Sequence, residues 1–119
     1  MPRARGGIDL GGTKIQAVVV DGDSEVLGEA RYPTPTAGGP ADVADALTAA
    51  LREAAEAAGV EPSALQGVGV GSPGAIDADA GTVSGARNLP GWAGTYPLAA
   101  ELGERLGTPV QLGNDVQVA

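Results

Sequence analysis

Two apolar, β-branched segments near the amino terminus are separated by a short polar stretch, and this interruption constrains the fold more than any other feature. In GIDLGGTKIQAVVVD (residues 7–21), residues 7–10 and 15–20 have the composition of strands, with a glycine pair between them. So short a connection predicts an antiparallel hairpin. The second strand ends at Asp-Gly-Asp, and residues 25–35 predict a third strand that prolines bring to a stop.

Helical and strand patterns alternate along the rest of the chain. In order, we expect a helix over 41–58, a glycine-rich strand and turn over 65–74, a loop with a turn at DADAG over 75–92, a helix from 97 that ends within 103–107, and a strand over 110–112. Three adjacent strands followed by helix, strand, helix and strand predict an α/β fold with a mixed β-sheet flanked by helices.

The composition excludes several classes of chemistry. The 119 residues suffice for one domain, and the formal net charge of -8 with only 7 Lys and Arg leaves no basic stripe for nucleic acid. Cysteine and histidine are both absent, which removes disulfides, thiolate nucleophiles, imidazole bases and any Cys/His zinc site from this chain. Its chemistry must therefore depend on carboxylates, hydroxyls, amides and backbone groups.

The first residues share one feature with an export signal, since basic residues precede apolar ones. Asp9, the glycines and Lys14 interrupt the apolar run that export requires. No stretch approaches the roughly 20 apolar residues of a membrane helix. We therefore expect a cytoplasmic protein without a membrane partner.

The polar stretch between the first two strands is a candidate phosphate-binding turn. Gly11 and Gly12 leave backbone N–H groups uncovered, and the Thr13 hydroxyl and Lys14 add donors. Asp9, directly before the turn, could hold the water shell of a Mg²⁺ ion that bridges phosphates. The alternative is a tight hairpin in which the glycines serve positive φ and Asp9 is merely exposed. A Walker loop and a dinucleotide fingerprint both fail, because GxxxxGK[ST] is absent and no helix is expected after the glycines.

Polar groups follow three later segments of the chain. Asp115, in GND after the last strand, could accept a proton from a substrate hydroxyl, and Asn114 could bond another hydroxyl. The amides of the turn that ends at Gly74 and the polar groups of Asn88 and Trp92 in RNLPGW could also contact a ligand. The alternatives are a helix cap at GND, an ordinary turn at GSPG, and a loop anchored by a buried Trp92.

Four stretches, in this order, resemble the amino-terminal lobe of the ROK family of sugar kinases, and most closely its bacterial glucokinases: GIDLGGTKIQAVVVD, GVGVGSPGAID, ARNLPGW and PVQLGNDVQVA. The resemblance covers essentially the whole chain. It implies the actin-like ATPase (ribonuclease H-like) fold, in which two lobes bind ATP and a hexose in the cleft between them.

The resemblance also implies a role for each matching residue. Asp9, Gly11, Gly12, Thr13 and Lys14 would contact the ATP phosphates, with Asp9 near Mg²⁺; Asp115 would be the catalytic base that deprotonates the sugar 6-hydroxyl; Gly74, Asn88 and Asn114 would contact the sugar. The implied activity is ATP-dependent phosphorylation of a hexose, and RNLPGW favours glucose. DLGGTK resembles the form that uses ATP, although polyphosphate as the donor stays open.

Other parts of the family pattern are missing from these 119 residues. The family's carboxy-terminal lobe carries its Glu-x-Gly-His sugar motif, its zinc site, the adenosine pocket and most dimer contacts. We therefore expect residues 1–119 to be a monomeric amino-terminal lobe with little or no kinase activity alone, whereas the full-length protein would be a homo-oligomer. NDVQVA also departs from the family's alanine-rich continuation, which leaves the helix register after Asp115 open.

Three other functions compete with a kinase. A sugar-sensing domain of a ROK transcriptional regulator shares the fold, but such regulators carry a helix-turn-helix segment ahead of it, and because the turn motif begins by Gly7 we expect no such segment here. A nuclease of the ribonuclease H type would hold two metals with Asp9 and Asp115, which the acidic balance disfavours. A non-catalytic fragment without a ligand is the third alternative.

Overall fold

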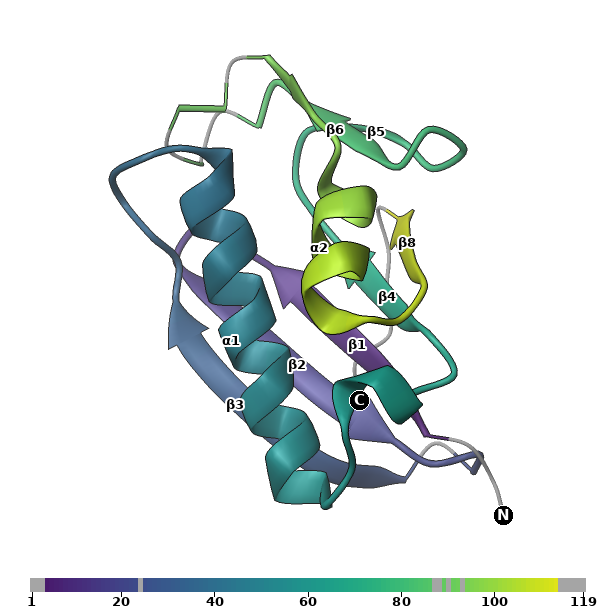
Figure 1. The fold of residues 1–119 in the computed structure, drawn as a ribbon. Helices are drawn as coiled ribbons and strands as arrows, with labels where there is room; N and C mark the ends of the chain where they lie inside the picture. Colours follow the sequence, from purple (N-terminus) through teal and green to yellow (C-terminus); the bar gives the residue numbers. More distant parts are fainter. Residues whose placement is uncertain (1–3, 24, 87–88, 90, 93, 114–119) are drawn as a thin grey trace.

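A mixed five-stranded sheet forms the body of the protein. The computed structural model describes residues 4–23, 25–86, 89, 91–92 and 94–113. The sheet order is β3-β2-β1-β4-β8, built from β1 (Arg5–Leu10), β2 (Lys14–Val20), β3 (Val26–Pro33), β4 (Val68–Gly71) and β8 (Val110–Gly113). The first three strands form an antiparallel meander, while β4 is parallel to β1 and β8 is parallel to β4 (Figure 1). The predicted α/β class and mixed sheet are confirmed.

Two helices, α1 (Pro40–Ala58) and α2 (Leu98–Leu106), cover one face of this sheet (Figure 1). Helix α1 begins where the Gly39 N–H donates to the Asp42 carboxylate (2.8 Å), and it ends at Gly59, whose φ of 75° suits a glycine cap. Both helices agree with the sequence prediction to within a residue or two. Within the described residues, neither helix is long and apolar enough to cross a membrane.

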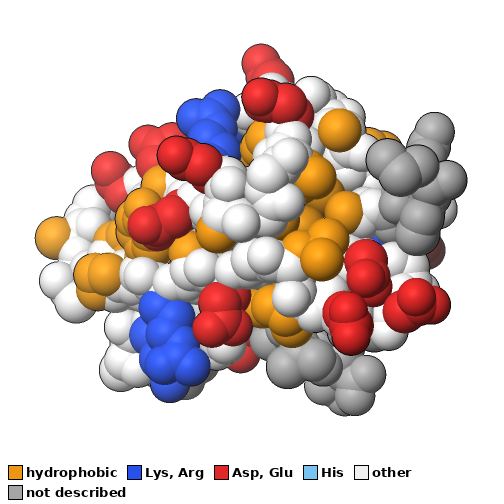
Figure 2. All heavy atoms as spheres, turned by 90° about the horizontal axis from the view of Figure 1, so that it is seen from below, with side chains coloured by type: hydrophobic (Ala, Val, Ile, Leu, Met, Phe, Trp, Pro, Cys, Tyr) orange, Lys and Arg blue, Asp and Glu red, His pale blue; other side chains and the backbone are white. Residues whose placement is uncertain are grey.

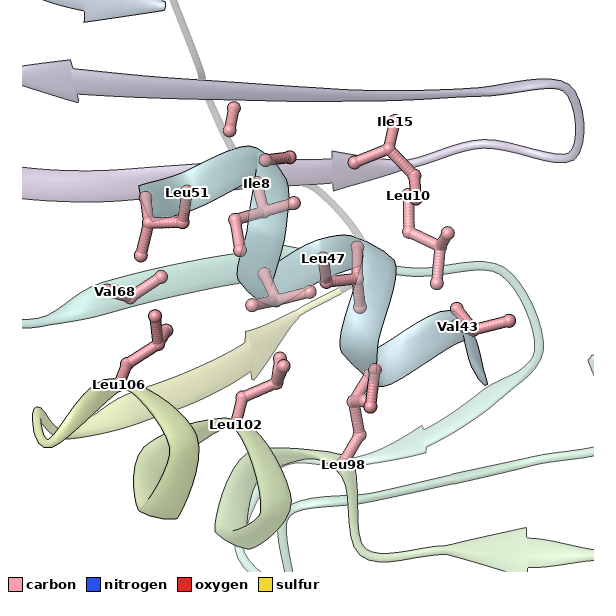
Figure 3. Packing of buried hydrophobic residues seen from close by; sticks show 14 of the residues in the cluster. Ile8, Leu10, Ile15, Val43, Leu47, Leu51, Val68, Leu98, Leu102 and Leu106 are labelled. Atoms are coloured by element: carbon pink, nitrogen blue, oxygen red, sulfur yellow. The ribbon is translucent and has the colours of Figure 1, made fainter. Parts of the chain in front are cut away.

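The core lies between the helices and the sheet. Leucines at four-residue intervals on α2 point toward α1 and the sheet in Figure 3. The fully buried side chains of this layer include Ile8, Ile15, Val43, Leu47, Leu51, Leu98 and Leu102. Burial of each such side chain contributes roughly 1.5–3 kcal/mol, so packing against α1 and α2 fixes which face of the sheet turns inward.

Helix α1 approaches β3 unusually closely at Gly28. A Cβ atom at this position would lie 2.2 Å from the Ala54 carbonyl oxygen and 2.7 Å from the Ala58 nitrogen. Both contacts are to helix backbone, which cannot move aside as the end of a side chain can. Gly28 is therefore the residue that lets strand and helix touch.

A second, three-stranded sheet corrects the prediction of a loop over residues 75–92. It consists of β5 (Ala75–Asp77), β6 (Thr82–Ser84) and β7 (Thr95–Tyr96), in the order β5-β6-β7. The predicted turn at DADAG is confirmed, because the Gly81 N–H donates to the Asp77 carbonyl (2.8 Å) and the Ala80 N–H to the Asp77 carboxylate (3.1 Å). The loop was wrongly predicted because strands of two or three residues are too short to show an alternating pattern. A single 3₁₀ turn, η1 (Pro62–Ala64), was not predicted either.

Trp92 holds the small sheet together. Its side chain is 2% exposed, and its indole N–H donates to the Val83 carbonyl of β6 (3.0 Å). Its ring meets that of Tyr96 edge-on, with centroids 5.5 Å apart. The interpretation of Trp92 as a buried loop anchor therefore agrees with the structure.

Candidate functional site

The carboxyl ends of three parallel strands bring the sequence motifs to one edge of the main sheet. In the sheet register, Asp9 of β1 lies opposite Gly71 of β4, and Gly71 lies opposite Gly113 of β8. Adjacent strands are about 4.8 Å apart, so Asp9 and Gly113 lie on strands separated by about 10 Å. Ligands of open α/β sheets bind at this kind of edge. The turns that follow β1 and β4 both begin at this edge of the sheet, and so does the GND motif at Gly113.

Asn114 and Asp115, the other two residues of GND, lie outside the described residues, as does Asn88 of RNLPGW. The structure fixes the strand end from which Asn114 and Asp115 continue, because Gly113 is the last residue of β8. The predicted roles of these three residues remain predictions.

The turn after β1 is a hairpin without a following helix, as predicted. The Gly11 N–H donates to the Lys14 carbonyl (3.0 Å), so this amide is occupied within the turn, whereas Gly12, Thr13 and Lys14 are exposed. Neither Gly11 nor Gly12 belongs to the positive-φ glycines found in the described part of the chain. Left-handed backbone therefore does not explain the glycine pair, which removes one part of the hairpin-only alternative.

Asp9 lies on the face of the sheet that α1 and α2 do not cover. Its neighbours Ile8 and Leu10 point into the core, so alternation along the strand directs Asp9 to the opposite face, where it is exposed. Lys14 shares that face, because Ile15 points into the core. The carboxylate and the ammonium group thus flank the turn from the same side.

One carboxylate beside an exposed turn fits a magnesium ion that arrives with a phosphate ligand. Mg²⁺ keeps several waters and is commonly held by one or two carboxylates together with substrate phosphates. The described residues contain no group of three or more His, Cys, Asp or Glu that would hold a metal without other ligands. Asp9 is therefore suited to a magnesium ion that arrives with a phosphate ligand.

The turn after β4 has a structural need for glycine at Gly74. Its φ is +94°, and a Cβ atom here would lie 2.7 Å from the Ser84 carbonyl oxygen of β6. The close approach of this turn to β6, the strand that pairs with β5, thus accounts for the glycine, in agreement with the ordinary-turn alternative. Contact between the amides of this turn and a sugar stays a prediction.

The described residues of RNLPGW place this loop against the turn that precedes α1. Leu89 is buried, and Gly91 has a φ of +63° and approaches the Gly38 carbonyl so closely that a Cβ would lie 2.9 Å from its oxygen. The amino end of α1 lies near the carboxyl ends of β1 and β4, at the top of the sheet in Figure 1. Gly91 therefore lies near the amino end of α1, at the same edge of the sheet as Asp9 and Gly113.

The tyrosines do not provide a base at this edge. Burial raises the pKa of the Tyr96 phenol above its ordinary value, and the Glu101 carboxylate adds to the rise. Desolvation and the Glu53 carboxylate raise the pKa of Tyr32 in the same direction. Both phenols therefore stay protonated at neutral pH.

Arg105 of α2 connects the two helices. Its hydrogen bond to Glu101 raises the pKa of the guanidinium, which also forms an ion pair with Asp45 of α1 (3.1 Å).

The opposite end of the molecule, beside the carboxyl end of α1, contains a hollow whose described lining includes no candidate site residue. A hollow of about 500 Å³ lies beside the carboxyl end of α1, lined by Arg52, Glu56, Gly59, Val60, Glu61 and Pro62, away from the edge where the motifs meet. Figure 2 shows the protein from this end, with basic side chains in separate groups among carboxylates. The described residues of this face therefore form no continuous basic stripe of the kind that nucleic-acid backbones require.

Comparison with known proteins gives a consistent family. The sequence model of the ROK family matches residues 5–119. The chain is 36% identical over 113 residues to a glucokinase of Streptomyces coelicolor, and 40% identical over 109 residues to an N-acetyl-D-glucosamine kinase of Salmonella heidelberg. These alignments cover 95% and 92% of this chain but 33% and 34% of the relatives. The chain thus spans about a third of the length of the curated relatives it matches.

Solved structures share the fold. A ROK family glucokinase from Streptomyces griseus, in complex with glucose and AMPPNP, superimposes with a TM-score of 0.79 at 34% identity, over 93% of this chain and 33% of that one. A ROK family transcriptional regulator, homologous to the Escherichia coli MLC protein, superimposes equally well (TM-score 0.79) over 97% of this chain and 28% of that one. At 19% identity, this second likeness shows the fold alone.

Proposed function

This chain belongs to the ROK family, and we propose that it supplies the phosphate-binding turn and the catalytic base of an ATP-dependent hexose kinase. The observation that supports the proposal is the register of β1, β4 and β8, which brings the carboxyl ends of these strands, including Gly113 at the start of GND, to one edge of the sheet. The glucose and AMPPNP in the Streptomyces griseus relative support a hexose and ATP as ligands. Among hexoses, we propose glucose.

Each residue then has a physical task. The exposed donors of Gly12, Thr13 and Lys14 bind phosphate oxygens, and Gly11 keeps the turn narrow. Asp9 would hold the Mg²⁺ that neutralises charge on those phosphates. Asp115 accepts the proton of the sugar hydroxyl, while Asn114, Asn88 and the turn at Gly74 orient the sugar. Phosphoryl transfer depends mostly on positioning and electrostatics, which this set of residues provides without a covalent nucleophile.

Binding of Mg–AMPPNP to the 119-residue chain tests the phosphate site. We expect saturable shifts of the Gly12, Thr13 and Lys14 amide signals in NMR spectra, and Asp9→Asn should weaken the magnesium-dependent binding by about tenfold, because a charge-assisted ligand is lost. Asp23→Asn, in the exposed turn between β2 and β3 at the opposite edge, is the matched control. Binding that leaves these amides unchanged would place the nucleotide elsewhere.

The isolated chain should nevertheless not catalyse phosphoryl transfer to a sugar. One lobe cannot enclose the reacting groups and exclude water, so we expect no glucose-dependent ADP release from residues 1–119 in a coupled assay. A chimera that carries residues 1–119 in place of the matching third of the Streptomyces griseus glucokinase should release ADP. Sustained ADP release by the isolated chain would contradict this prediction, and a folded but inactive chimera would favour a sugar-sensing role like that of the regulators.

A further inference from the structure

Thr34 contacts the turn after β1 through both of its hydrogen-bond donors. Its hydroxyl donates to the Gly11 carbonyl (2.8 Å), and its backbone N–H donates to the Thr13 carbonyl (3.1 Å). The residue follows β3 directly and is 4% exposed, although it comes more than twenty residues after the turn. Our sequence-based prediction did not include it, and its only signal is a hydroxyl residue between two prolines at a strand end.

The peptide geometry connects these contacts to the phosphate donors. A trans peptide group holds its carbonyl and its N–H on opposite sides of the chain. When the Gly11 carbonyl points to the Thr34 hydroxyl, the N–H of Gly12 in the same peptide group points away from Thr34. The Lys14 N–H is related in the same way to the Thr13 carbonyl. Thr34 thus fixes the directions of the Gly12 and Lys14 N–H groups, because it donates hydrogen bonds to the carbonyl oxygens of the same two peptide groups.

The flanking residues make Thr34 a stiff support. Pro33 and Pro35 restrict the backbone on either side, and a residue before proline is confined to extended conformations. Neither proline has an N–H, so Thr34 provides the backbone donor of this segment. The ladder between β2 and β3 then holds the segment against the turn, because Lys14 lies opposite Pro33.

The other buried hydroxyls act differently. Of the buried polar side chains in the described part of the chain, Thr48 bonds within its own helix and Ser72 to its neighbouring residue. The Thr108 hydroxyl donates to the Leu65 carbonyl (3.0 Å), at the far end of the sheet from the turn. Thr108 is therefore a buried threonine with an equivalent long-range bond and no contact to the turn, which makes it a matched control.

We propose that Thr34 is a positioning residue for phosphate binding, which orients the Gly12 and Lys14 amides through the Gly11 and Thr13 carbonyls. This inference rests on the proposed function, because it assumes that the turn binds nucleotide phosphates. A hydroxyl at position 34 is the essential group. Serine should preserve the effect, whereas valine, of nearly the same shape, should remove it.

Titration of the 119-residue chain with Mg–AMPPNP, followed by amide NMR and by thermal unfolding, tests the proposal. Thr34→Val should weaken Mg–AMPPNP binding by about five- to tenfold, the usual worth of one hydrogen bond, while Thr34→Ser should stay within about twofold of the unsubstituted chain. Thr108→Val should lower the unfolding temperature by as much as Thr34→Val but leave the affinity unchanged. Equal affinities of the unsubstituted and Thr34→Val chains, or equal losses in Thr34→Val and Thr108→Val, would overturn the proposal.

A failure of the proposed function gives a different result. If the unsubstituted chain binds no Mg–AMPPNP, the phosphate site itself is refuted, and with it the assignment of Thr34 to phosphate binding. The residual dipolar coupling of the Gly12 N–H, measured without ligand, then reports the geometric step separately. A change in Thr34→Val but not in Thr34→Ser supports orientation of the turn by the hydroxyl, and an unchanged coupling refutes it.

Discussion

Gly28→Ala should destabilise the protein by about 3 kcal/mol, at the upper end of the usual cost of overpacking. The added methyl group would lie 2.2 Å from the Ala54 carbonyl oxygen and 2.7 Å from the Ala58 nitrogen, so β3 and α1 would have to separate. Such a separation would loosen the packing of α1 against the sheet, which buries Leu47 and Leu51 of the helix. Since a whole domain is stable by only about 5–15 kcal/mol, one methyl group would remove a large part of the total.

Thermal and urea unfolding of the variant measure this effect. A loss of this size corresponds to a fall of about 10 °C in the unfolding temperature for a domain of this length. Gly94→Ala is the control, because no atom of the described residues lies within 4 Å of a Cβ at Gly94 and Gly94 is not among the positive-φ glycines. An unfolding temperature for Gly28→Ala equal to that of Gly94→Ala would show that α1 does not lie against β3 as described.

The long elements of this fold could be predicted because their patterns are local. The apolar period of α1, the proline at its start and the glycine after it all lie within twenty residues, and the structure confirms both ends. The hairpin between β1 and β2 follows in the same way from two β-branched runs with a short connection. In each case neighbouring residues carry the whole signal.

The small sheet could not be predicted because its stability comes from distant contacts. Strand β7 has two residues, and its pairing with β6 depends on the packing of Tyr96 against Trp92 and on the bond from Trp92 to Val83. The close approach at Gly28 is a similar case. A lone glycine in a strand indicates that some backbone or ligand lies near, but the sequence does not say that the neighbour is α1.

The strand ends at the candidate site could be predicted from the sequence, but the contacts that hold the turn after β1 could not. The strand ends at Asp9, Gly71 and Gly113 could be predicted because polar and glycine residues end apolar strands, and the parallel register places these three residues side by side. Thr34 was missed because a buried threonine at a strand end looks like many others. Its importance depends on which carbonyls it meets, and only the tertiary structure supplies that information.

Asp115→Asn should lower kcat by about a thousandfold in the chimeric kinase, within the range by which a general base accelerates proton transfer. Asparagine has nearly the same shape as aspartate but cannot accept the proton of the sugar hydroxyl. In the proposed mechanism the nucleotide phosphates bind to the turn after β1, and β1 is two strands away from β8 in the sheet, so we expect the KM for ATP to be unchanged. A coupled ADP assay at saturating glucose measures both constants, and Asp23→Asn, in the exposed turn at the opposite edge, controls for the loss of a carboxylate.

The same substitution separates the base from a helix cap. Asparagine caps helices about as well as aspartate, so a residue that only begins a helix would tolerate Asp115→Asn with full activity. If Asp115 is the catalytic base, the Asp115→Asn chimera should lose activity without a change in its unfolding temperature. Asp115→Ser, which also keeps a capping oxygen, should behave like Asp115→Asn, because neither side chain retains a carboxylate. Activity close to that of the unsubstituted chimera in both variants would remove Asp115 from the proposed mechanism. The residue that follows the carboxyl end of β8 would then have only a structural role.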